Sequence, residues 1–160
     1  MQFKVGTGFS IIIIILMFTG LTVITDYTEA ETFEQKIIVQ NYIKNGFEID
    51  FDQILFLGQE IRLRARDRLQ TFYKRRDYKL AWIYNNTLKP SGRNLLTLLE
   101  NADQKGLFPG EYYLALIHQL HFQVYKTEAE LKQKFLVKLD LLITEAAFIY
   151  MSDVARGRIN

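Results

Sequence analysis

The hydrophobic pattern of the chain starts with a long uncharged run near the N-terminus. No charged residue lies between Phe9 and Thr25, whereas Lys4 precedes the run and acidic residues follow it soon afterwards. A helix that spans a membrane needs about 17–25 apolar residues, and the apolar region of a cleaved signal has about 7–15. We therefore expect residues 1–30 to be a membrane anchor or a signal segment. The length of the run and its isoleucines favour a retained anchor, small residues at 28–30 leave cleavage open, and Lys4 favours export of everything that follows.

Helical periodicity governs most of the remaining chain. Residues 31–53 have a short mixed pattern that is typical of a linker with one short element. From Ile54 to about Arg75, apolar residues come to recur every three or four positions, which predicts an amphipathic helix. Residues 78–83 lack this spacing. We expect that segment to be extended and to be anchored to the core by Trp82.

Start and stop signals delimit two further helices. Pro90 begins the first, and Gly106 stands where a left-handed C-cap belongs. Pro109 begins the second, and its apolar positions continue to about His121. Both helices have one apolar stripe, so we expect each to pack one face against a common core.

The last predicted helix is the longest. Thr127 to Glu130 form a capping-box sequence, in which the hydroxyl and the carboxylate each bind an otherwise unpaired backbone N–H. The apolar stripe then continues to about Ala155, and Gly157 is a natural C-cap. Because we find no hairpin signal and no alternating run, the sequence predicts an all-α fold, with an irregular helical scaffold domain over residues 54–160.

Composition narrows the possible functions. The chain has 160 residues, of which 49% are hydrophobic, and this is enough for one modest domain. Its net charge of +2 is too small to indicate a nucleic-acid partner. The absence of cysteine excludes disulfides, thiolate metal sites and a Cys nucleophile.

Two histidines, His118 and His121, lie three positions apart on a predicted helix. Paired metal ligands can have this spacing, but a zinc site needs about four ligands and no third ligand is placed by spacing. We therefore expect ordinary polar side chains here, with no metal and no cofactor.

Three carboxylates, Asp140, Glu145 and Asp153, lie on the last predicted helix. Glycosidases use paired carboxylates as acid and base, so a hydrolase of the cell wall that uses Glu145 is one interpretation. However, glycosidases place their two carboxylates across a cleft, and carboxylates on a single helix usually form a solvated face. We favour the solvated face.

A densely basic stretch runs from Arg62 to Arg76 and contains Phe72 and Tyr73. Export would exclude nucleic acid as its partner. Anionic phospholipid headgroups, acidic glycan or a solvated helix face with ion pairs remain, and the solvated face is the simplest of the three.

Three segments together resemble the helical scaffold domain of the large L,D-transpeptidases. Residues 72–82 are similar to the segment FY..R.Y..AW that opens this domain, residues 94–113 to the stretch LL..L..A...GL.P..Y, and residues 139–158 to the helix LD..LT.A...Y..D...GR. Their order and spacing agree with the family. The chain thus resembles this family from about Phe72 to Asn160.

The resemblance implies a non-catalytic scaffold in an enzyme that cross-links peptidoglycan during cell-wall formation, at the bacterial cytoplasmic membrane or in the periplasm. It also implies two partner domains that follow this region: a peptidoglycan-binding module and a catalytic domain with a nucleophilic Cys. Because the chain has no Cys, it should be inactive alone, and no catalytic residue can be transferred to it. The matched residues are expected to have packing, capping or domain-docking roles, and Arg158 is expected to contact the next domain. The matched residues are Tyr73, Tyr78, Trp82, Gly106, Thr144, Asp153, Gly157 and Arg158.

A second interpretation is a stand-alone helical module. Such a protein would be anchored to the membrane through residues 9–25 and would bind peptidoglycan or a partner protein in trans, without an enzyme attached.

Overall fold

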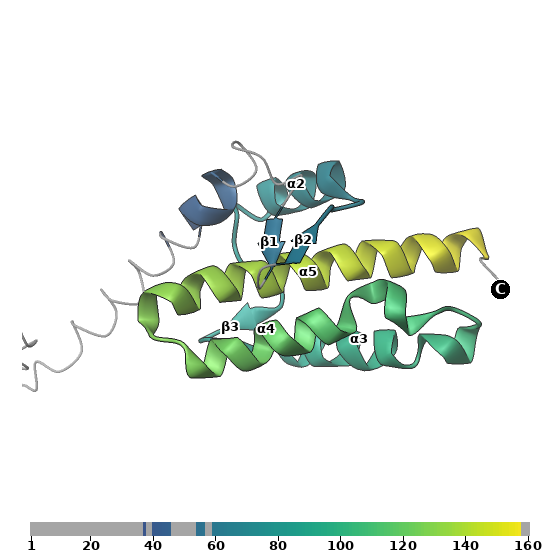
Figure 1. Cartoon of the computed structure of the whole chain (residues 1–160). Coiled ribbons are helices and arrows are strands. Elements are labelled where there is room, and N and C mark those ends of the chain that lie inside the picture. The colour runs from purple at the N-terminus through teal and green to yellow at the C-terminus, as the bar shows by residue number, and fades with distance from the viewer. Residues whose placement is uncertain (1–36, 38–39, 46–53, 57–58, 158–160) are drawn as a thin grey trace, which may run out of the picture.

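The computed structural model describes residues 37, 40–45, 54–56 and 59–157, and Figure 1 shows their arrangement. The predicted membrane or signal segment, residues 1–30, lies outside the described residues, as does most of the predicted linker. Within the described part, none of the helices has the length and apolar character needed to cross a bilayer. The elements are, in chain order, β1 (Ile54–Phe56), β2 (Gln59–Ile61), α2 (Arg66–Arg75), β3 (Ile83–Tyr84), β4 (Thr87–Leu88), α3 (Pro90–Glu100), the 3₁₀ helices η2 (Ala102–Lys105) and η3 (Pro109–Tyr112), α4 (Leu114–Lys126) and α5 (Ala129–Arg156).

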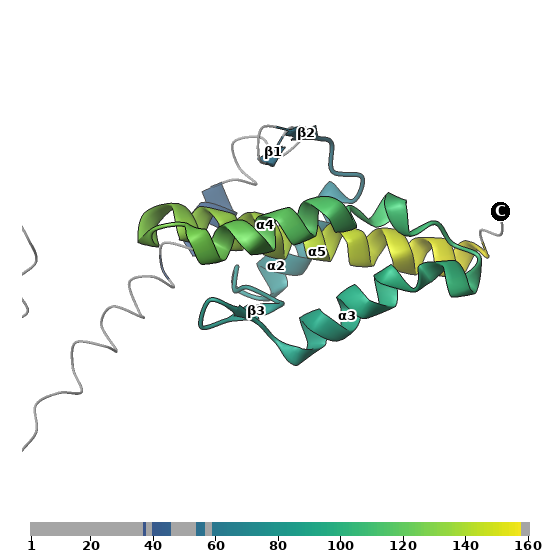
Figure 2. The ribbon, with the colours of Figure 1, turned by 60° about the horizontal axis from the view of Figure 1, so that its bottom comes forward.

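Helix α5 is the centre of the domain. Figures 1 and 2 show α4 running back along α5, and in Figure 1 α2 lies on the other side of α5 from α3 and α4. Every residue from 139 to 147 is buried, so α5 is covered on all its faces along this stretch. A helix that is enclosed in this way does not need the single apolar stripe of a surface helix.

One hydrophobic core joins the elements. Its buried members include Leu69 of α2, Leu99 of α3, Ile117 of α4 and Leu142 of α5. Ile43, from the helical residues 40–45 that precede the hairpin, is also fully buried in this core. The short N-terminal helical segment is therefore held on the domain by apolar packing.

The all-α prediction is correct only for the larger part of the domain, which is mostly helical. Residues 54–61, predicted to begin a helix, instead form the antiparallel hairpin β1–β2, in which Ile54 pairs with Ile61, and α2 begins at Arg66. A second antiparallel hairpin, β3–β4, follows α2.

The second hairpin is explained by its two-residue loop. Asn85 and Asn86 have φ angles of 46° and 60°, and a type I′ turn requires positive φ at both central residues. Asparagine accepts this conformation more readily than most residues. The Asn-Asn pair is thus a hairpin signal, and the expectation of no hairpin in this chain is wrong.

Two helix starts differ from the prediction. The segment after Pro109 is a short 3₁₀ helix, and α4 begins at Leu114. The capping box at the start of α5 is wrong, because Glu128 is the N-cap residue and makes no side-chain capping bond. The Thr127 hydroxyl instead donates to the carbonyl oxygen of Gln123, at 2.7 Å, and so satisfies the end of α4.

The two predicted glycine caps are confirmed, but two helix ends differ from the prediction. Helix α3 already ends at Glu100, so Gly106 caps η2, and α4 continues to Lys126. Gly106 and Gly157 have φ angles of 71° and 60°, the left-handed conformation of a C-cap. The N–H of Gly157 lies at the end of α5 and donates to the carbonyl of Val154.

Truncation of a core residue in α2 should destabilise the domain strongly. Leu69→Ala removes a side chain with no exposed surface, and such changes lower the free energy of unfolding by about 2–5 kcal/mol. The matched change Leu98→Ala, at a side chain that is 40% exposed, should cost clearly less. Urea unfolding of residues 31–160, followed by far-UV circular dichroism, measures both. Equal losses would show that α2 does not share the core.

Candidate functional site: buried polar contacts along helix α5

Asp140 of α5 is fully buried and holds the chain between α2 and β3. One carboxylate oxygen accepts hydrogen bonds from the Tyr73 hydroxyl at 2.6 Å and the Ala81 N–H at 2.8 Å. The other accepts from the Trp82 N–H at 2.8 Å. A buried carboxylate is costly unless donors surround it, and here one side chain and two backbone groups supply them.

Thr144 lies one turn further along α5 and extends the same network. Its hydroxyl accepts from the indole N–H of Trp82 at 2.8 Å, lies 2.8 Å from the Tyr73 hydroxyl, and donates to the Asp140 carbonyl. Tyr73, Trp82, Asp140 and Thr144 therefore form one connected set, which we call the α5 polar network. It fixes α2 and the following loop against α5.

Side chains bind several backbone groups of residues 79–82, which lie between α2 and β3 outside regular structure. Besides the two N–H groups bound by Asp140, Lys89 Nζ donates to the Ala81 carbonyl at 2.8 Å and to the Leu80 carbonyl at 3.3 Å. Arg76 donates to the carbonyls of Lys79 and Leu80. Paired backbone groups allow an irregular segment to lie against a core.

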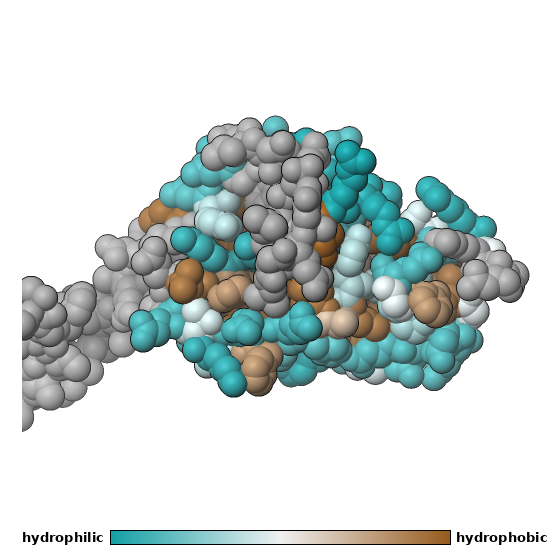
Figure 3. Space-filling model, viewed as in Figure 1, coloured by the Kyte–Doolittle hydropathy of each residue, from teal (hydrophilic) through white to brown (hydrophobic). Residues whose placement is uncertain are grey.

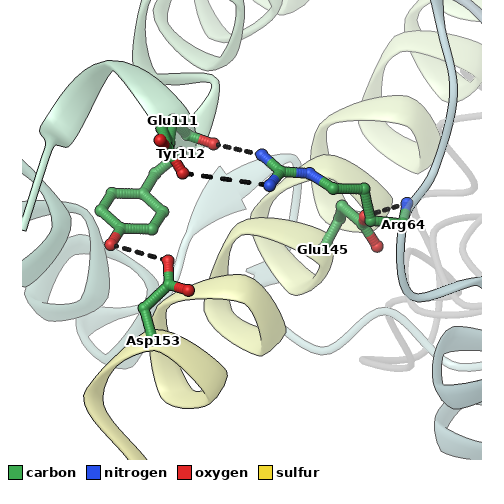
Figure 4. Close-up of polar contacts among 5 residues, drawn as sticks. All are labelled: Arg64, Glu111, Tyr112, Glu145 and Asp153. Carbon is green, nitrogen blue, oxygen red and sulfur yellow. Dashed lines mark hydrogen bonds and ion pairs between the residues drawn. The ribbon is translucent and has the colours of Figure 1, made fainter. Parts of the chain in front are cut away.

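Glu145 repeats this arrangement on the segment before α2. Its Oε1 accepts from the Arg64 N–H at 2.5 Å and from the Ala65 N–H at 3.1 Å, and it has no exposed surface (Figure 4). Residue 65 is the N-cap of α2, so the carboxylate meets the chain where that helix starts. Glu145 thereby fixes the position of the α2 N-terminus.

A third contact holds η3. The Tyr112 hydroxyl donates to Asp153 at 3.2 Å, and both side chains are buried. The more exposed Arg64 guanidinium reaches the same turn, where it donates to the Glu111 carbonyl at 3.2 Å and lies 4.0 Å from the Glu111 carboxylate (Figure 4). Three acidic residues of α5 thus bind three separate segments of the chain.

Burial dominates the electrostatics of these groups. It raises the pKa of Asp140 and of Glu145, while the N–H and O–H donors around each carboxylate act in the opposite direction. Burial and the nearby Asp140 raise the pKa of Tyr73 well above its usual value. Burial, followed by Asp153, raises the pKa of Tyr112 to about 12. Both tyrosines therefore remain neutral donors near pH 7.

The predicted solvated face of carboxylates is wrong. Asp140, Glu145 and Asp153 are all buried, and each is bound by groups of the domain itself. A general acid or base has to exchange a proton with the substrate. Glu145 cannot do so while it is buried and accepts hydrogen bonds from two backbone N–H groups. The geometry therefore gives no support to the hydrolase interpretation.

The two histidines contact different residues. His118 lies 3.1 Å from the Glu100 carboxylate, and His121 lies 3.3 Å from the Tyr125 hydroxyl. Among the residues that the structure describes, no group of three or more His, Cys, Asp or Glu side chains is placed to hold a metal ion.

The structure brings together some of the residues expected to have packing or docking roles. Tyr73, Trp82 and Thr144 form the α5 polar network with Asp140, and Asp153 binds Tyr112. Tyr78 is half-buried with a φ of 55°, in the turn that ends α2. Gly106 and Gly157 are distant caps, and Arg158 lies outside the described residues.

Sequence reasoning missed the partners that these residues bind. Asp140 and Glu145 were predicted to lie on a solvated face, with catalysis as the less favoured interpretation, and Glu111 and Tyr112 were named only as part of the family resemblance. A signal was present, since an acidic residue between buried neighbours within an apolar helix usually needs a partner. The identity of the partners, which include backbone N–H groups more than 50 positions away, had no signal in the sequence.

These features define a mostly helical domain whose polar centre is structural. The model of the Scaffold domain family matches residues 67–160, more than half of the chain. The chain therefore belongs to the Scaffold domain family, in agreement with its resemblance to the scaffold domains of L,D-transpeptidases. No curated protein and no solved structure gave a significant match.

Replacing Asp140 by Asn should destabilise the domain by about 2 kcal/mol or more, because the amide places an NH₂ group where a backbone or hydroxyl donor requires an acceptor. Glu128→Gln makes the same chemical change at an exposed N-cap without a side-chain capping bond, and should cost at most about 1 kcal/mol. Urea unfolding measures both. A neutral Asp140→Asn would mean that the carboxylate does not hold the loop.

The Tyr112 hydroxyl should make stability depend on alkaline pH. In the unfolded chain a tyrosine loses its proton near pH 10.0, whereas folding raises the pKa of Tyr112 to about 12. The contribution of the Tyr112 hydroxyl to the free energy of unfolding is fully present below pH 10. It is lost as pH rises towards 12, because Tyr112 ionises at lower pH in the unfolded chain than in the folded chain. The difference in unfolding free energy between wild type and Tyr112→Phe should shrink over this range. If the difference between wild type and Tyr112→Phe stayed constant over this pH range, the raised pKa of Tyr112 would be contradicted. Tyr84→Phe, at an exposed tyrosine, is the control.

Proposed function

We propose that this chain is the non-catalytic scaffold region of an L,D-transpeptidase that cross-links peptidoglycan, carried on the outer side of the bacterial cytoplasmic membrane. The uncharged run at 9–25 supports a membrane anchor, with the remaining chain exported. The match to the Scaffold domain family over residues 67–160 carries the proposal.

The contacts of α5 suit a holding role. Asp140, Glu145 and Asp153 each bind a segment of this domain, so the described acidic centre serves rigidity rather than reaction. A helix of 28 residues extends about 42 Å, long enough to connect the two ends of the domain. Rigid support of this kind keeps a reactive site in a productive orientation.

The chemistry belongs to partner domains. A Cys thiolate of the catalytic domain would attack a peptide stem, release its leaving amine and form a thioester, and an amine of a neighbouring stem would then displace the thiolate. This chain contains no Cys and would contribute position, while a peptidoglycan-binding module and the wall itself would be the further partners.

Removal of the domain tests the proposal in the bacterium that makes the protein. We expect in-frame deletion of the codons for residues 67–157 to lower the amount of L,D-cross-linked muropeptides, measured by mass spectrometry of digested sacculi. Leu98→Ala, at an exposed position, is the control and should leave the amount unchanged. An unchanged muropeptide pattern after the deletion, at equal protein abundance, would falsify the scaffold role in cross-linking.

A stand-alone binding module is the alternative, because the described residues have a hydrophobic core of their own. Cosedimentation of residues 31–160 with purified sacculi distinguishes the stand-alone module from the transpeptidase scaffold. Binding by the isolated domain, together with an unchanged muropeptide pattern after deletion, would favour the module.

A further inference from the structure

Helix α2 has one apolar face and one strongly basic face. Leu69 and Tyr73 are buried against α5, which fixes the orientation of the helix. The opposite face is exposed and polar, and Figure 3 shows hydrophilic side chains gathered over this edge of the molecule. The exposed cations of α2 and of residues 62–65 before it are Arg62, Arg64, Arg68, Lys74 and Arg75. Among residues 62–75, whose exposure the structure describes, Asp67 is the one exposed acid.

These cations are only partly engaged by the domain. Arg64 contacts Glu111, and the Arg68 guanidinium lies over the Phe148 ring at 5.9 Å. For Arg62, Lys74 and Arg75, the described part of the chain provides no ion pair. The predicted solvated face is confirmed, but the predicted ion pairs are not seen for these three cations. Among the described residues, positive charge on this surface is therefore in excess.

The turn at the C-terminal end of α2 contacts Gln40, a residue that follows the uncharged run closely in the sequence. Gln40 Nε2 donates to the Asp77 carbonyl at 2.7 Å, just beyond the end of α2, and Ile43 is buried in the core. Only residues 26–39 separate Gln40 from the end of the run at Thr25. Even fully extended, this connection reaches about 50 Å, so the end of the uncharged run stays within about 50 Å of Gln40.

We propose that the exposed basic face of α2 and the segment before it, formed by Arg62, Arg68, Lys74 and Arg75, docks on anionic phospholipid headgroups. This inference rests on the membrane anchor proposed above for residues 9–25. Guanidinium groups bind phosphate in bidentate fashion, and a tethered basic surface meets the headgroups at high effective concentration. Such a contact favours one orientation of the domain over the bilayer, with α2 towards the lipid and α3, on the other side of α5 in Figure 1, away from it.

The experiment uses the full chain in lipid nanodiscs of phosphatidylcholine, with or without phosphatidylglycerol. Because the chain has no cysteine, Thr71→Cys on exposed α2 and Thr97→Cys on exposed α3 each provide a single labelling position. A fluorophore at position 71 should be quenched by a headgroup quencher more strongly than one at position 97, in the anionic nanodiscs only. Raised salt should abolish the difference.

Charge removal tests the surface directly. The double variant Lys74→Gln with Arg75→Gln should lower the equilibrium constant for docking of α2 on the anionic bilayer about thirtyfold. Each cation near such a surface raises this constant about fivefold. Lys126→Gln with Lys134→Gln removes the same charge from exposed positions on α4 and α5 and should leave docking unchanged. Thermal melts show that all variants fold.

Several results would overturn the proposal. Equal quenching at positions 71 and 97, quenching independent of lipid charge, or equal effects of the two charge pairs would each show that α2 is not the docking face. Failure of the chain to enter either nanodisc would contradict the anchor on which docking depends. Binding of heparin that requires Lys74 and Arg75, without lipid-dependent quenching, would assign the surface to another polyanion. None of these outcomes depends on cross-linking activity.

Discussion

The arrangement of the domain depends on the hydrogen bonds that the buried carboxylate of Asp140 accepts from backbone N–H groups. An ionised carboxylate without water around it is unstable unless donors surround it, so the loop carrying Ala81 and Trp82 has to lie against α5. That loop joins α2 to the second hairpin and to α3. Fixing it therefore determines where three elements meet the central helix.

The acidic residues add a specificity that the apolar core does not provide. Leucine and isoleucine side chains pack acceptably in many relative positions, whereas a hydrogen bond is satisfied only within a narrow range of distance and angle. Asp140, Glu145 and Asp153 each bind a different segment, so together they define the position of α2, its preceding loop and η3 along α5. The core supplies most of the stability, and these contacts select the arrangement.

The parts of the fold that the sequence predicted are those with local signals. Pro90 and Gly157 mark a helix start and a helix end through the backbone angles that they favour, and both predictions are correct. Gly106 has the predicted left-handed conformation, although it caps η2 and not the helix that begins at Pro90. The first hairpin was missed because strands of three residues have too few positions to show alternation. The prediction for the carboxylates is wrong because a polar residue on an amphipathic helix normally faces water. Only the tertiary packing shows that these three positions of α5 are buried.

The two faces of α2 connect the interior of the domain with its proposed docking surface. Tyr73 bonds to Asp140 on the inner face, and Lys74 and Arg75 follow directly on the outer face. A helix turns about 100° per residue, so the inner hydrogen bond limits the directions in which these cations can point. The buried network of α5 therefore also sets the orientation of the surface charge. A loss of the Tyr73 contact would disturb docking even though Tyr73 itself, being fully buried, cannot touch a lipid.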